Sequence, residues 1–114
     1  MDRYLWNLHF GGQRVVSKAR ESGAPIDGVV ISAGIPEPDE APELIASLRA
    51  SGFSHIAVKP GTVAQIRAGL GIARQIEDTG ASLILQVEDG HAGGHHSWEN
   101  LDDLLTATYA EIRR

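Results

Sequence analysis

The segment with the greatest concentration of chemically active side chains covers residues 88–99 and reads EDGHAGGHHSWE. It places three histidines and three glycines within twelve positions, directly after the apolar run ASLILQV. Glycines let backbone N–H groups approach a ligand closely, and a histidine beside them can exchange a proton near neutral pH. The pattern therefore indicates a loop that binds a ligand or carries out acid–base chemistry.

Two kinds of chemistry fit this loop. One is a zinc or other divalent-metal site, since imidazole and carboxylate groups are common ligands, although the spacing matches no fixed motif such as H-E-x-x-H. The other is general acid or base catalysis by one histidine beside a cofactor held against the glycines, and the spacing alone does not choose among the three histidines. The candidate metal ligands are Glu88, Asp89, His91, His95, His96 and Glu99.

The hydropathy pattern around the loop alternates between buried-strand and amphipathic-helix signals. Strands are predicted from Ile26 to Ser32, in FSHIAVKPG and in ASLILQVED. Helices are predicted in GGQRVVSKARESG, from Ala41 to the exit at Ser51-Gly52, in GTVAQIRAGLGIARQIEDTG and in SWENLDDLLTATYAEIRR. The order α-β-α-β-α-β-α predicts an α/β fold with parallel strands joined by right-handed crossovers.

Each predicted helix has an apolar face that should point toward the core. Thr62 and Gln65 have the spacing of a capping box at the start of the third helix. Gly69 and Gly71 weaken that helix and are expected to permit close packing. The inward residues, helix by helix, are Val15, Val16 and Ala19; Ala41, Leu44, Ile45 and Leu48; Val63, Ile66, Leu70 and Ala73; and Leu101, Leu104, Leu105, Thr108 and Ile112.

Polar or small residues follow each predicted strand, and parallel strands present their carboxyl ends, where ligands bind, on one side. Ser32-Ala33-Gly34 could equally be a tight turn. Lys59 is either a surface lysine or a cation that needs a partner or an anionic ligand near the core. Gln86 needs hydrogen-bond partners from a ligand or from a neighbouring loop. These three groups are expected to meet at one edge of the sheet.

The composition of the chain excludes several classes of protein. With 114 residues the chain can build one modest core, and its net charge of −5 argues against binding to nucleic acid. It has no cysteine, which excludes disulfides and thiolate metal sites. No signal peptide or membrane-spanning run is evident, so a soluble, cytoplasmic protein is expected.

Several stretches resemble the enoyl reductase domain of type I fatty acid synthases, as found in mycobacteria and related bacteria and in the fungal β subunit. They are GAPIDGVVISAGIPEPDEAPELI, HIAVKPGTVAQI and LILQVEDGHAGGHHSWENLDDLL, with YLWNL near the start and ATYAEIRR at the end. The resemblance implies a TIM barrel that carries FMN, in the wider group that includes nitronate monooxygenases. It implies reduction, with NADPH, of a 2-enoyl thioester carried on acyl carrier protein. A nitronate monooxygenase-like oxidoreductase is the alternative within this group.

The resemblance also assigns roles to residues. By the match of Ala92-Gly93-Gly94-His95 to an AGGH loop, His95 is the catalytic residue, and His96 is an additional, structural one. The cofactor-binding residues that it implies are Ser32, Ala33, Gly34, Lys59, Gln86, Gly93 and Gly94.

A complete (β/α)₈ barrel typically needs about 250 residues, whereas this chain contains three βα repeats and an N-terminal helix. We therefore expect residues 1–114 to form a single partial domain, part of a TIM barrel, whose partners are the remaining segments of a synthase. Unpaired strand edges and an open apolar sheet face predict either self-association or marginal stability of the isolated chain, which is not expected to turn over substrate. A non-catalytic or metal-binding fragment is the remaining alternative.

Overall fold

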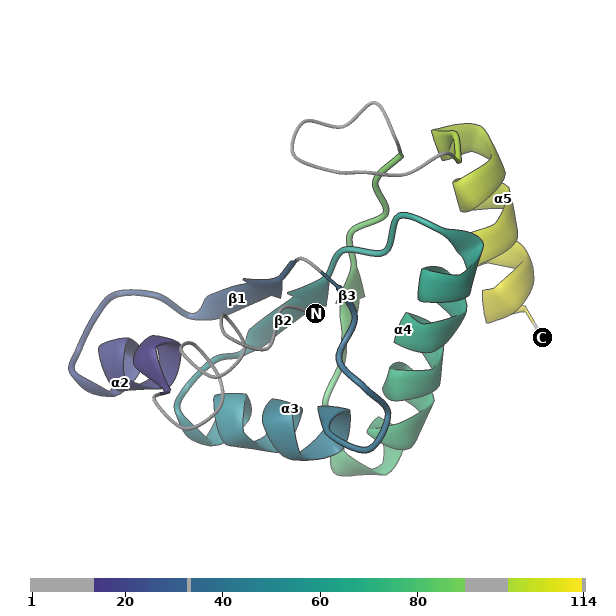
Figure 1. Cartoon of the computed structure of the whole chain (residues 1–114). Coiled ribbons are helices and arrows are strands. Elements are labelled where there is room, and N and C mark those ends of the chain that lie inside the picture. Colours follow the sequence, from purple (N-terminus) through teal and green to yellow (C-terminus); the bar gives the residue numbers. More distant parts are fainter. Residues whose placement is uncertain (1–13, 33, 90–98, 114) are drawn as a thin grey trace.

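The computed structural model describes residues 14–32, 34–89 and 99–113. Helices and strands alternate along the chain, as the hydropathy pattern predicts, but the strands are shorter than predicted (Figure 1). The elements are α2 (Val15–Glu21), β1 (Gly28–Ile31), α3 (Ala41–Ala50), β2 (His55–Val58), α4 (Val63–Gln75), the 3₁₀ helix η1 (Glu77–Thr79), β3 (Ile84–Leu85) and α5 (Leu101–Ile112).

The three strands form one parallel sheet in the order β1-β2-β3, which is also their order in the sequence. In the register of the sheet, Ile31 lies opposite Val58, and Val30 lies opposite Ala57. Ala57 in turn lies opposite Ile84. Because the order never reverses, each crossover moves the chain one strand further in the same direction.

One face of the sheet is covered by α3 and α4 (Figure 1). The side chains that alternate toward this face come from β1 and β2, and they join residues of both helices in a single apolar cluster. Ile76 and Phe53, which follow α4 and α3, complete this cluster. Its buried members are Ile31, Ala41, Leu44, Ile45, Leu48, Phe53, Ile56, Val58, Ile72 and Ile76.

Helix α4 lies close to the sheet because Gly69 has no side chain. A Cβ atom at Gly69 would lie 2.8 Å from Cδ2 of Leu85, whereas one at Gly71 would meet nothing within 4 Å. The prediction of close packing is therefore confirmed for Gly69 and wrong for Gly71. The predicted inward face is also partly wrong, since Ile72 is buried while Leu70 and Ala73 are only half-buried.

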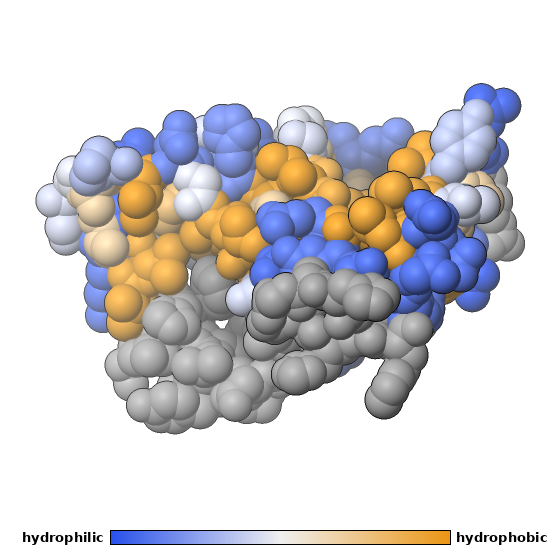
Figure 2. Space-filling model, turned by 90° about the horizontal axis from the view of Figure 1, so that it is seen from above, coloured by the Kyte–Doolittle hydropathy of each residue, from blue (hydrophilic) through white to orange (hydrophobic). Residues whose placement is uncertain are grey.

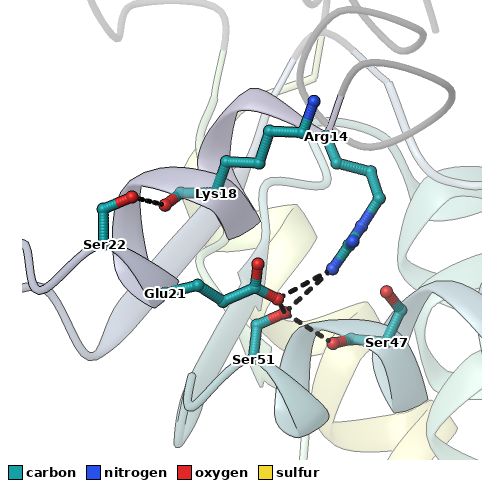
Figure 3. A network of polar contacts seen from close by, with 6 residues as sticks. All are labelled: Arg14, Lys18, Glu21, Ser22, Ser47 and Ser51. Carbon is teal, nitrogen blue, oxygen red and sulfur yellow. Dashed lines mark hydrogen bonds and ion pairs between the residues drawn. The ribbon is translucent and has the colours of Figure 1, made fainter.

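Helix α2 buries only part of the apolar face that its sequence predicts. Val15 and Ala19 are exposed, Val16 is half-buried, and Ser17 is the buried residue. The helix is also attached by polar contacts to Ser51, the C-cap residue of α3, since the Arg14 guanidinium lies 3.4 Å from Ser51 Oγ, which donates to Glu21 Oε1 at 3.1 Å (Figure 3). Val16 packs against the apolar cluster, so the predicted inward face is confirmed for Val16 and wrong for Val15 and Ala19.

Helix α5 packs sideways against α4, so that one side of its predicted apolar face is covered (Figure 1). Leu104 is fully buried, and Arg67 Nε of α4 donates to Glu111 Oε1 at 2.9 Å. Leu101, Leu105 and Ile112, which were predicted to point inward, are exposed. No helix among the described residues is long and apolar enough to cross a membrane.

The second face of the sheet carries no helix among the described elements. The in-register row Val30–Ala57–Ile84 alternates toward this face, and Val30 and Ile84 are 52% and 47% exposed. In the view from above, apolar atoms form a band across much of the surface (Figure 2). Of the described elements, helices therefore cover one face of the sheet and none covers the other, the open face, on which Ala57 of the central strand is nevertheless buried.

Candidate functional site

The predicted site residues at the strand ends lie on the open face of the sheet. The pairing of β2 with β3 continues beyond the strands, because Gln86 N–H donates to Val58 O at 2.9 Å and Glu88 N–H to Pro60 O at 3.1 Å. Extending the register by one residue therefore brings Ser32, Lys59 and Gln86 into one row. Side chains alternate along a strand, so this polar row lies directly beyond the apolar row on the same face.

A carboxylate joins two members of this row. Lys59 Nζ lies 3.3 Å from Glu88 Oε2, and Gln86 Nε2 donates to Glu88 Oε1 at 2.9 Å. The side chains of Lys59 and Glu88 are only 24% and 16% exposed. Lys59 is therefore a cation with an acidic partner near the core and not a free surface lysine. The predicted hydrogen-bond partner of Gln86 is Glu88, two residues further along the chain. Lys59 and Gln86 thus converge on Glu88, as expected for one edge of the sheet.

The segment after β1 bends at Gly34. Gly34 has a φ of 127°, a backbone conformation that residues with a side chain rarely adopt, and it is half-buried. Ser32 is exposed at the end of β1, whereas Ala33 lies outside the described residues. The bend therefore favours a glycine for backbone reasons.

The N-terminus of α4 lies at the same edge and is closed by side chains. Thr62 Oγ1 accepts from the N–H of Gln65 at 3.1 Å, which confirms the predicted cap, and Gln65 Oε1 accepts from Gly61 N–H at 2.8 Å. The Glu99 carboxylate accepts from Val63 N–H, with its two oxygens at 3.2 and 3.3 Å. A negative charge is favoured at a helix N-terminus, where the first N–H groups lack partners within the helix.

Both ends of segment 88–99 are thus attached to the turn between β2 and α4. Glu88 binds Lys59 at one end, and Glu99 binds Val63 N–H at the other. The sequence identified both glutamates only as candidate metal ligands, because a cap supplied from a distant segment has no local sequence pattern. The structure gives each of them a partner within the protein.

The remaining predicted site residues lie outside the described part of the chain. These residues are Gly93, Gly94 and His95, together with His91 and His96 of the proposed metal site. Among residues 14–32, 34–89 and 99–113, no group of three His, Cys, Asp or Glu side chains is arranged to hold a metal ion. The described part of the site is therefore a row of polar groups at the carboxyl edge of a parallel sheet.

Comparison with known proteins identifies relatives of this chain. Residues 82–114, from β3 through α5, match a family described as fatty acid synthase subunit beta/Fas1-like, helical. The chain is 45% identical over 91 residues to fatty acid synthase 2 of Mycosarcoma maydis, a match that covers 80% of the chain and 2% of the relative.

Two further relatives give the same result. The chain is 45% identical over 94 residues to the fatty acid synthase beta subunit aflB of Emericella nidulans, a match that covers 82% of the chain and 4% of the relative. It is 41% identical over 92 residues to the fatty acid synthase subunit beta of Schizosaccharomyces pombe, again covering 81% of the chain and 4% of the relative. The chain is therefore homologous to a small segment of fungal fatty acid synthase β subunits.

Proposed function

From this homology to fatty acid synthase β subunits, we propose that the chain is part of an FMN-dependent, NADPH-using enoyl reductase. Its substrate would be a 2-enoyl thioester on acyl carrier protein, reduced during fatty acid biosynthesis. The chain would act together with the remaining segments of the synthase, because it spans only 2–4% of the relatives described above.

The observation that carries this proposal is the pair of rows on the open face of the sheet. The row Ser32–Lys59–Gln86 is polar and lies at the carboxyl end, and the row Val30–Ala57–Ile84 below it is apolar. In a β/α barrel the inward face of each strand is apolar, and polar ligand-binding groups gather at the carboxyl ends. A sheet whose order follows the sequence, with its helices on one face, supports a barrel segment.

The described residues at this edge fit the polar rim of a flavin. Lys59 provides a positive charge, and the amide of Gln86 can both donate and accept hydrogen bonds. Gly34, which has no side chain, would let a flat ring approach its backbone. The Glu88 carboxylate fixes the Lys59 and Gln86 side chains in position, because each contacts one of its two oxygens.

Each residue then has a defined task in the proposed reaction. The chemistry that FMN supplies when bound is the passage of a hydride from NADPH to the β-carbon of the thioester. The imidazole of His95 would deliver the proton that the α-carbon requires. Lys59 would favour negative charge at the flavin ring, and Gly93 and Gly94 would allow the loop to lie against it.

A chimera tests this proposal. The segment of the S. pombe β subunit that aligns with this chain is replaced by this chain's own residues, and NADPH-dependent reduction of a 2-enoyl thioester is measured together with bound FMN. We expect activity, and a loss of at least about 100-fold in His95→Ala with the FMN content unchanged. His55→Ala is the matched control, since His55 is exposed at the amino end of β2.

Two outcomes would contradict the proposal. If His95→Ala and His55→Ala reduce the thioester at the same rate, the glycine-rich loop does not supply the proton. If the chimera holds FMN but oxidises alkyl nitronates instead of reducing the thioester, the chain belongs to the alternative reaction class.

A further inference from the structure

The outer side of α5 presents an apolar stripe. Its residues recur at positions i, i+4, i+8 and i+11, so that they lie along one side of the helix. The buried contact of α5 with α4, through Leu104 and Glu111, lies on a different side. The stripe consists of Leu101, Leu105, Tyr109 and Ile112, which are 40%, 50%, 65% and 60% exposed.

Opposite charges flank the two ends of this stripe. Asp102 and Asp103 lie in the first turn of α5, and Arg113 caps its last turn with its guanidinium carbon 5.7 Å from the centre of the Tyr109 ring. Successive residues of a helix are rotated by about 100°, which places Asp102 and Arg113 along the same margin of the stripe. The helix therefore has an acidic beginning and a basic end beside one continuous apolar strip.

We propose that this stripe is an interface for a second copy of the chain, with the two α5 helices packed antiparallel. A two-fold axis near the middle of α5 would place Leu101 opposite Ile112 of the second copy. The same axis would place Leu105 opposite Tyr109 of the second copy. Such an interface uses one surface patch twice and is complementary to itself.

Charge supports the antiparallel direction and the choice of a second copy. The same two-fold axis would bring Asp102 beside Arg113 of the second copy, and this pair would occur twice in the dimer. In a parallel arrangement the acidic ends of the two helices would lie side by side, and so would the basic ends. Such like-charge pairs are unfavourable. The charges of α5 are therefore complementary to those of a second α5 helix that runs in the opposite direction.

The neighbouring surface also fits this arrangement. A groove with a volume of about 390 Å³ lies between α4 and α5, lined by Leu70, Ala73, Arg74, Glu77 and Ile112. Since Leu101 of the second copy would lie opposite Ile112, its side chain would enter this groove. Four apolar side chains per copy make a small interface, for which dissociation in the micromolar range is expected. The proposal is independent of flavin binding.

Sedimentation equilibrium of the 114-residue chain at micromolar to millimolar concentration tests the proposal. We expect a monomer–dimer equilibrium. Asp102→Arg and Arg113→Asp should each raise the dissociation constant about tenfold or more, because each places like charges together at both ends of the interface. The double variant should return to near the original value. Asp39→Arg is the control, since it reverses an exposed charge outside α5.

Three results would overturn the proposal. If the chain stays monomeric from micromolar to millimolar concentration, the stripe does not bind a second copy and is the surface for a different segment or partner. A dimer that tolerates all three charge variants but is lost in Val30→Lys would be held together by the open sheet face. A double variant as weak as the two single variants would show that the two charges do not face each other.

Discussion

The ammonium group of Lys59 lies 3.3 Å from a carboxylate oxygen of Glu88, an ion pair that joins the carboxyl end of β2 to the segment after β3. The other Glu88 oxygen accepts a hydrogen bond from Gln86. Together with the backbone bond from Glu88 N–H to Pro60 O, these contacts fix the edge of the sheet at which the histidine-containing segment begins.

A double-mutant cycle will measure this ion pair. Both side chains are less than a quarter exposed, so removing one partner leaves a poorly hydrated charge behind. Lys59→Met and Glu88→Gln should each lower the free energy of unfolding by about 1–2 kcal/mol. The double variant should lose less than the sum of the two by about 1 kcal/mol in urea unfolding. Strictly additive losses would show that the two groups do not interact.

The cap of α4 gives a second prediction. Thr62→Ala removes the hydroxyl oxygen that accepts from Gln65 N–H and should cost about 1 kcal/mol of folding free energy. Thr106→Ala is the matched control, because Thr106 is an exposed residue within α5 and should change stability by less than about 0.5 kcal/mol. Urea unfolding of both variants measures the difference. Equal effects would mean that the Thr62 hydroxyl does not stabilise the helix.

The two glycines of α4 give a third prediction, with opposite expectations for the same change. Gly71→Ala should stabilise the protein by about 1 kcal/mol, because alanine is the better helix former and the added Cβ meets open space. Gly69→Ala should be less stable than Gly71→Ala by about 1 kcal/mol or more, because its Cβ requires Leu85 to move. Thermal unfolding of the pair checks this. If both variants were stabilised equally, α4 would not lie as close to β3 as described.

The order of elements was predictable from the sequence because it depends on local patterns. β-branched runs between Gly and Pro predicted β1 and β2, and the helical spacing of apolar residues predicted α3 and α4. The cap at Thr62 followed from the spacing of two residues. The convergence of Lys59 and Gln86 followed from a general property of parallel strands.

The predictions that failed concern contacts between elements. Local spacing gives a helix an apolar face but does not say which face meets a neighbour, so Val15 and Leu105 are exposed contrary to the prediction. The polar attachment of α2 through Arg14 to Ser51, and the cap that Glu99 gives to α4, join residues far apart in the sequence. No local pattern marks such pairs.

We propose that the carboxyl edge of the sheet and the glycine-rich loop form part of a flavin site. An FMN titration of the 114-residue chain, followed by flavin fluorescence and thermal stability together, tests it most directly. We predict saturable binding that raises the melting temperature, with a stabilisation of about 2.7 kcal/mol at an FMN concentration one hundred times Kd. Gly94→Val should abolish both signals, and Lys59→Met should weaken them. No saturable change in a chain that circular dichroism shows to be folded would contradict the claim.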